Sequence, residues 1–317
     1  MPKAVVKMPG TCGELVQGVM DGISFHVSCP VNIYSVVEVE LNGDVSVLDY
    51  PPERPKAASA VMKALEFLGR PNLGGRLTIQ SPIPLGKGMA SSTADVAAAI
   101  EATTLALGKR VKRREVAELA LTIEPTDGSL FPGVVLFDHR QGRVYEPLSS
   151  PPPLDIVILD FGGEVDTIKF NRCNHSAALH RLEPQIAEAL ELVRGGIASG
   201  DPRLVGQGAT TSAQANQKIL FKPQLEQVIS LAREVGAVGV NVAHSGTVIG
   251  VLLDARRCDK EAVADFLRRR LSGLESLLIC SLIGGGCDCD SPNEKKKEVK
   301  FYEQFHITDI EGDKASR

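Results

Sequence analysis

The residues from Pro82 to Ile100 read PIPLGKGMASSTADVAAAI, and they decide how the rest of the chain is interpreted. Two glycines flank Lys87, and three hydroxyl residues at 91–93 then open an alanine-rich run. Glycine tolerates positive φ, so the backbone N–H groups of such a loop can converge on an anion. The N-terminus of a following helix adds partial positive charge. The stretch therefore predicts a phosphate-binding loop followed by a helix that the three hydroxyl residues can cap.

Two common phosphate motifs do not describe this loop. A P-loop requires Gly-Lys-Ser/Thr at a fixed distance from an earlier glycine, and a dinucleotide fingerprint requires a third glycine. Neither pattern is present between residues 82 and 100. On loop chemistry alone, the plain alternative is an ordinary glycine turn with an N-cap.

Composition narrows the class of protein. The chain has 317 residues, 43% hydrophobic and 23% charged, with a formal net charge of −4, which suits one large or two modest soluble domains. No apolar run is long enough to span a membrane, and no signal-peptide pattern opens the chain. Mild acidity argues against nucleic acid as the main partner. Seven scattered cysteines, an odd number, favour reduced thiols, so we expect a cytoplasmic protein.

Strand patterns dominate the first fifty residues. We expect strands at 4–7, 23–27 and 31–41, with Pro9-Gly10 breaking the first of them. Alternation of apolar and polar residues in 31–41 predicts one solvated face. Asn42-Gly43-Asp44 indicates a hairpin into a strand at 45–48.

Helical spacing and proline position set the remaining organisation. The best linker signal is Ser149 to Pro153, because three consecutive prolines sustain neither helix nor sheet. We place a domain boundary there, giving units 1–150 and 151–291 and a charged tail at 292–317. Helices are expected at 55–69, 94–107, 113–122, 176–193, 202–217, 225–235 and 260–271, and strands at 77–80, 134–138, 154–161 and 277–283.

Three further places carry candidate chemistry. Asp127 lies in the turn Thr-Asp-Gly-Ser, where an Asp commonly bonds its own backbone but can also act as a base. Residues 236–250 (GAVGVNVAHSGTVIG) predict a glycine-rich turn between two strands. Cys287 and Cys289 are one residue apart, but no second Cys or His pair lies near them in sequence, so a zinc site is not favoured.

Three segments together resemble the GHMP kinases, the superfamily of galactokinase, homoserine kinase and mevalonate kinase. Residues 84–94 (PLGKGMASSTA) are similar to the family's phosphate motif, and residues 243–247 (AHSGT) are a substituted version of its glycine-rich third motif. Residues 8–18 (MPGTCGELVQG) resemble its first motif, in the form found in the L-threonine kinases that serve cobalamin synthesis. Departures include Met89, Ala90 and Thr93, and Thr11 stands where other members carry Lys or Arg. Lys7 or Lys87 could supply that missing cation.

The resemblance implies a fold and a set of ligands. The expected fold is α+β, with an N-terminal domain like ribosomal protein S5 domain 2, a C-terminal ferredoxin-like domain, and ATP between them. By the resemblance, Thr11, Gly13, Glu14 and Gln17 would bind the substrate. Mg²⁺ would be held by Ser91 (or Ser92) with Glu124 or Glu118. The residues expected at ATP are Pro84, Leu85, Gly86, Lys87, Gly88, Met89, Ala90, Ser91, Ser92, Thr93, Ser245 and Gly246.

The resemblance also implies a reaction. Asp127 would take the proton of an acceptor hydroxyl as it attacks the γ-phosphate, while Lys87 adds positive charge. The expected acceptor is L-threonine, giving O-phospho-L-threonine for cobalamin biosynthesis by a monomer or homodimer. Two alternatives stay open: a GHMP kinase for another small alcohol, such as homoserine or an isoprenoid alcohol, and a nucleotide-binding regulator without turnover.

Overall fold

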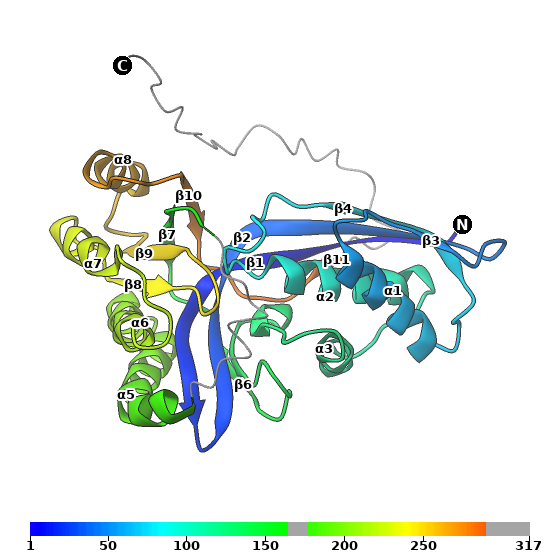
Figure 1. The fold of residues 1–317 in the computed structure, drawn as a ribbon, viewed down its shortest axis with the longest axis horizontal. Helices are drawn as coiled ribbons and strands as arrows, with labels where there is room; N and C mark the ends of the chain where they lie inside the picture. Colours follow the sequence, from blue (N-terminus) through cyan, green and yellow to red (C-terminus); the bar gives the residue numbers. More distant parts are fainter. Residues whose placement is uncertain (164–175, 290–317) are drawn as a thin grey trace, which may run out of the picture.

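The computed structural model describes residues 1–163 and 176–289. Its strands form one curled sheet in the order β10-β7-β9-β8-β1-β2-β4-β3, with β11 beside β1 and β5–β6 attached to β2. The helices pack on this sheet in two groups, one for each half of the sequence (Figure 1). This mixture of helices with a largely antiparallel sheet confirms the expected α+β class. The proposed tail at 292–317 and Cys173 lie outside the described residues.

Two long strands, β1 (Lys3–Met20) and β2 (Ile23–Asn42), run as one hairpin from the first half of the molecule to the second (Figure 1). Asp21 and Gly22 form its two-residue turn, both with positive φ, as a twisted hairpin requires. The expectation that Pro9-Gly10 would end the first strand is wrong. Pro9 pairs with Tyr34, and three register irregularities between Pro9 and Val16 absorb the disruption.

The hairpin predicted at Asn42-Gly43-Asp44 is also wrong. The chain turns there, but β3 is only Leu48–Asp49, and it pairs in parallel with β4 (Gly74–Gln80) instead of antiparallel with β2. Gly74 N–H donates to the Val45 carbonyl at 2.8 Å, so the segment after the turn is held by β4. The alternation predicted for 31–41 is confirmed, because buried positions there alternate with more exposed ones.

Three helices cover the first half: α1 (Pro55–Phe67), α2 (Ser91–Ala106) and α3 (Arg113–Leu121). Helix α2 is buried on nearly all sides between β1, β2 and α1. Its alanines explain this position, because small side chains let neighbouring backbones approach closely. The short helix η1 (Gly128–Leu130) and strands β5 (Val134–Phe137) and β6 (Tyr145–Ser149) close this half.

The second half places β7 (Leu154–Asp160), β8 (Gly239–Val242), β9 (Ile249–Asp254) and β10 (Ser276–Ser281) in antiparallel order. Its helices are α5 (Ser176–Ser199), α6 (Pro202–Asn216), α7 (Leu225–Glu234) and α8 (Lys260–Arg270). The short β11 (Asp288–Cys289) returns to β1. The proline run 151–153 connects β6 to β7, so the boundary placed there falls between two strands of one sheet.

Two further expectations concern the whole chain. Among the described residues, no helix has both the length and the apolar character needed to cross a bilayer. No disulfide joins the five cysteines whose side chains are described, and Cys12, Cys29 and Cys280 are buried.

Candidate functional site

One pocket of about 660 Å³ brings the predicted motifs together. The phosphate loop forms one wall, with Gly86, Gly88 and Ser91 among its lining residues. The segment 123–127 forms another, and the turn after β8 contributes His244 and Ser245. The β1 strand adds Glu14 at the inner end. Segments more than two hundred residues apart in sequence therefore line a single cavity.

The phosphate loop has the backbone that its glycines predict. Gly86 and Gly88 have φ of 71° and 79°, and Ala90, the residue before α2, is also left-handed with φ of 55°. Such a run of left-handed residues turns successive N–H groups toward a common side, at the positive end of α2. The loop and the helix start therefore provide an anion site of the kind that binds phosphate.

The sequence predicted that the hydroxyl residues 91–93 cap helix α2, and this prediction is wrong. The N-cap is Ala90, which makes no side-chain cap, and residues 91–93 lie in the first turn. Ser91 Oγ instead accepts from Arg54 at 3.3 Å, Ser92 Oγ donates to Glu124, and Thr93 Oγ1 accepts from the Asp127 N–H at 3.3 Å. These hydroxyls tie the helix start to both neighbouring walls of the pocket.

The third motif closes on the phosphate loop. The N–H groups of Thr247 and Val248 both donate to the Lys87 carbonyl, at 3.1 and 3.3 Å. Gly246 lies against Lys87 and Gly88 so closely that a Cβ there would clash with the loop backbone. The glycine at 246 is explained by this approach, and Ser245 lines the pocket beside it.

Lys87 does not line the pocket. Its ammonium donates to Asp160 Oδ1 at 3.2 Å and to the Gly163 carbonyl at 2.9 Å. Only 15% of its side chain is exposed. The charge that the sequence places on the phosphate loop is thus paired at the end of β7.

Two carboxylates meet at the inner end of the pocket. Glu14 is 5% exposed, and one of its oxygens, Oε2, accepts from the His244 N–H at 2.6 Å. Asp127 Oδ1 lies 3.3 Å from His26 Nδ1 and 3.5 Å from Ser28 Oγ. Burial, followed by the negative charge of Asp127, raises the pKa of Glu14 well above its usual range. The pocket therefore has an inner end that attracts positive charge.

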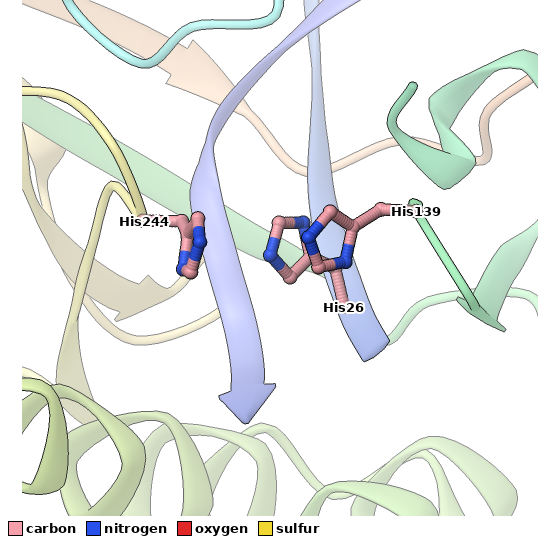
Figure 2. A group of neighbouring side chains, drawn as sticks. All are labelled: His26, His139 and His244. Carbon is pink, nitrogen blue, oxygen red and sulfur yellow. The ribbon is translucent and has the colours of Figure 1, made fainter. Parts of the chain in front are cut away.

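Three histidine rings gather beside these carboxylates, and Figure 2 shows how His26, His139 and His244 lie relative to one another. His26 and His139 stack with ring centroids 3.7 Å apart and planes 10° from parallel, and His244 lies tilted against them. Burial, together with the neighbouring imidazoles, lowers the pKa of His139 well below its usual range. A metal ion lies in the plane of each imidazole that binds it, so a nearly parallel stack is a poor arrangement for one shared ion. The rings act as packing and hydrogen-bonding groups around the two acids.

Of the four residues predicted to bind the substrate, one lines the pocket and three support the structure around it. Only Glu14 lines the pocket. Gln17 is buried and holds His244, since its Oε1 accepts from His244 Nδ1 at 2.8 Å while its amide donates to the Val242 carbonyl. Gly13 has φ of 53° and touches the backbone at Ala243 so closely that a Cβ would lie 2.6 Å from Ala243 N. Thr11, 1% exposed, is buried beneath the loop, and its N–H donates to the Met89 carbonyl.

Oxygen donors suitable for a hard divalent cation gather on the opposite wall. Glu124 lines the pocket, contacts Ser92 and pairs with Lys56 at 2.5 Å. Glu118, the other acidic candidate, is 63% exposed in an ion pair with Arg114 on the surface of α3. Asp95, one turn after Ser91, also lines the pocket and pairs with Arg54 at 2.5 Å. This set of hydroxyl and carboxylate oxygens fits Mg²⁺ chemistry.

Sequence reasoning missed several of these residues. Nothing in the sequence led us to expect a functional role for His26, His139, Arg54 or Asp95. The signal for Asp95 was present, because a carboxylate four residues after Ser91 shares its helix face. Nothing local indicates His139, since only the pairing of β2 with β5 brings it to His26.

Comparison with known proteins identifies the fold and motifs. Family models for the GHMP kinase N-terminal and C-terminal domains match residues 56–131 and 178–273. An L-threonine kinase from Citrobacter freundii is 35% identical over 270 residues, covering 84% of this chain and 92% of that protein. The chain belongs to the GHMP kinase family. A second L-threonine kinase, from Salmonella typhimurium, is 37% identical over 262 residues, with 81% and 85% of the two chains covered.

Solved GHMP-type structures share the fold at low sequence identity. A homoserine kinase from Cytophaga hutchinsonii superposes with a TM-score of 0.68 at 17% identity, covering 92% of this chain and 98% of that one. An L. major mevalonate kinase in complex with R-mevalonate has a TM-score of 0.69, also at 17% identity, covering 90% and 96%. As a GHMP kinase, this protein is an ATP-dependent enzyme that phosphorylates a small molecule.

Proposed function

We propose that this GHMP kinase transfers the γ-phosphate of ATP to the side-chain hydroxyl of L-threonine, producing O-phospho-L-threonine. The observation that carries the proposal is the single pocket in which the phosphate loop, Asp127 and Glu14 meet. The two L-threonine kinase relatives support the choice of acceptor. A homoserine kinase from Moorella thermoacetica is a weaker match, 25% identical over 61% of this chain, so that acceptor is not favoured.

The proposed roles follow from placement in the pocket. The backbone of residues 84–93, with Ser245 and Gly246, holds the phosphates of ATP at the start of α2. Asp127 receives the hydroxyl proton of threonine; His26 and the Thr93 contact to its backbone fix its position. Catalysis then rests on orienting the two substrates and neutralising charge, because phosphoryl transfer needs little covalent help from the protein.

Magnesium is assigned to the wall formed by α2 and Glu124. Ser91 or Ser92 with Glu124 would hold the ion, which supplies positive charge to the phosphate oxygens when bound. Lys87 is proposed to act on the phosphates through the loop that it anchors to Asp160, since its ammonium is already paired there. We further propose a cytoplasmic enzyme whose product feeds cobalamin biosynthesis.

The test is ATP consumption with Mg²⁺ across L-threonine, L-serine, L-homoserine and mevalonate. We expect turnover with L-threonine well above that with the other alcohols. Preference for another member of the panel would keep the kinase and reject the acceptor. ATP binding without turnover of any of them would favour the nucleotide-binding regulator.

A further inference from the structure

The inner end of the pocket contains two carboxylates with different surroundings, the buried Glu14 and Asp127, whose side chain is 20% exposed. Asp127 is held by donors, because an ionised carboxylate only accepts and His26 Nδ1 and Ser28 Oγ both face its Oδ1. Glu14 uses Oε2 for the His244 N–H. Its Oε1 lies 3.8 Å from His26 Nδ1 and accepts no hydrogen bond from the part of the chain that the structure describes.

The nearest candidate cations do not satisfy that oxygen. The His26 Nδ1 proton is directed to Asp127, which is the closer acceptor. Lys222 acts on Glu14 only at a distance: its charge opposes the rise in the pKa of Glu14, but its ammonium donates to the Ala243 carbonyl at 3.0 Å. An unpaired oxygen on a buried glutamate, beside a second carboxylate, is costly unless a positive donor reaches it. Because Glu14 lines the pocket, that donor can come from a ligand.

A second feature of the same place also indicates a missing donor. Within the described residues, His26 Nε2 and His139 Nδ1 are buried and have no hydrogen-bond partner. Both rings are about 95% buried and line the pocket. With Nδ1 protonated toward Asp127, a neutral His26 carries its lone pair on Nε2. His26 Nε2 is therefore an acceptor at this end of the pocket, beside the oxygens of Glu14 and Asp127.

The distance between the two acids suggests which ligand fits. The facing atoms of Glu14, His26 and Asp127 all lie within 4.8 Å of one another. An ammonium at about 2.8 Å from Glu14 and a hydroxyl at about 2.8 Å from Asp127 can therefore lie close together on one ligand. In a 1,2-amino alcohol the two groups are on adjacent carbons, whereas homoserine separates them by one carbon more.

We propose that Glu14 binds the α-ammonium group of the acceptor while Asp127 faces its hydroxyl, so that the pocket selects vicinal amino alcohols. This inference rests on the proposed function and adds the chemical class that the acceptor site recognises. Glu14 is a specificity-determining residue in this arrangement. His244 and Gln17 position it, since His244 donates its backbone N–H to Glu14 and its ring to Gln17.

The test compares three ligands and three proteins. Dissociation constants are measured in the presence of Mg²⁺ and a non-hydrolysable ATP analogue for L-threonine and for (R)-3-hydroxybutanoate, the same molecule without its amino group. The proteins are the wild type and Glu14→Gln, whose amide oxygen still accepts from the His244 N–H. Turnover of L-threonine and L-homoserine is followed in parallel. Glu226→Gln, an exposed change on α7, is the matched control.

In the wild type we expect loss of the ammonium to weaken binding by about 10- to 150-fold, the worth of one charged hydrogen bond. In Glu14→Gln the two ligands should bind alike, and the preference for L-threonine over L-homoserine should narrow. Equal weakening of both ligands in the variant, or no preference for the amine in the wild type, would overturn the inference and leave threonine turnover intact. Failure of the wild type to bind or phosphorylate L-threonine would instead overturn the proposed function together with it. The wild-type comparison stands even if the variant does not fold.

Discussion

The Lys87 ammonium lies 3.0 Å from Asp160 Oδ2, an ion pair that joins the middle of the phosphate loop to the end of β7. Asp160 also accepts from Thr247 Oγ1 at 3.3 Å and from the Gly162 N–H at 3.0 Å. The Asp160 carboxylate, at the end of β7, therefore connects that strand to the phosphate loop and to the third motif. Both side chains are at least 85% buried, so this ion pair anchors the phosphate loop to β7 away from solvent.

Breaking this pair should loosen the loop and destabilise the protein. Lys87→Met or Asp160→Asn should each lower the free energy of unfolding by about 1–3 kcal/mol, because each leaves a buried partner unsatisfied. The double variant should lose little more than either single one, since the same interaction is removed. Urea unfolding of the four proteins measures this. Fully additive losses would mean that the two residues act separately.

Asp127→Asn tests the proposed base. The amide keeps the shape of the side chain and an acceptor for His26, but it does not take a proton. We expect kcat to fall by about 10²–10⁴-fold, the range for loss of a general base, while the affinity for an ATP analogue stays unchanged. Steady-state kinetics with titration of the analogue separate the two effects. An Asn variant with full turnover would remove Asp127 from this role.

Glu124→Gln tests the assignment of the magnesium wall. Removing one carboxylate should raise the Mg²⁺ concentration needed for half-maximal activity by about tenfold, the equivalent of one charge-assisted contact. Glu118→Gln is the control, because it makes the same change on the exposed surface of α3. Activity is measured across a Mg²⁺ titration at saturating ATP. An equal response of the two variants would reject Glu124 as a ligand.

Glu101 should make stability depend on pH. Burial, then the nearby Cys287, raises the pKa of Glu101 from 4.5 to about 7, although Arg113 opposes the shift. A raised carboxyl pKa means that the folded protein binds the proton more tightly than the unfolded chain. Below the pKa of the unfolded chain, Glu101 is protonated in both states and imposes no penalty. As pH rises from 4.5 to 7, the free energy of unfolding falls by about 1–3 kcal/mol, because the unfolded chain releases the proton first.

The comparison with Glu101→Gln isolates this effect. The wild type should become less stable relative to the variant as pH rises from 4.5 to 7, and the difference should be constant above that range. Urea unfolding at several pH values measures the change. A difference that does not vary with pH would show that folding does not change the pKa of Glu101.

Local chemistry explains what could be predicted. Most helix bounds, the buried strand at 154–160 and the turn after β8 follow from periodicity and glycine placement and appear at or near the expected residues, although α5 extends to Ser199, beyond the expected end at 193. Two errors arose where tertiary contacts override a local signal. Pro9-Gly10 continues a strand because β2 supplies pairing on both sides of the bulges, and residues 45–49 follow β4 because the Gly74 N–H finds its acceptor there.

The sequence by itself determined the backbone of the phosphate loop, because glycine readily adopts the positive φ that Gly86 and Gly88 have. Tertiary structure alone decided which charges meet. Glu14 reaches the His244 N–H across 230 positions of sequence, and Lys87 turns to Asp160 rather than into the pocket. Such pairings depend on how the curled sheet brings distant segments together and on which polar groups lose their contact with water when they are buried. No local sequence pattern encodes either of these.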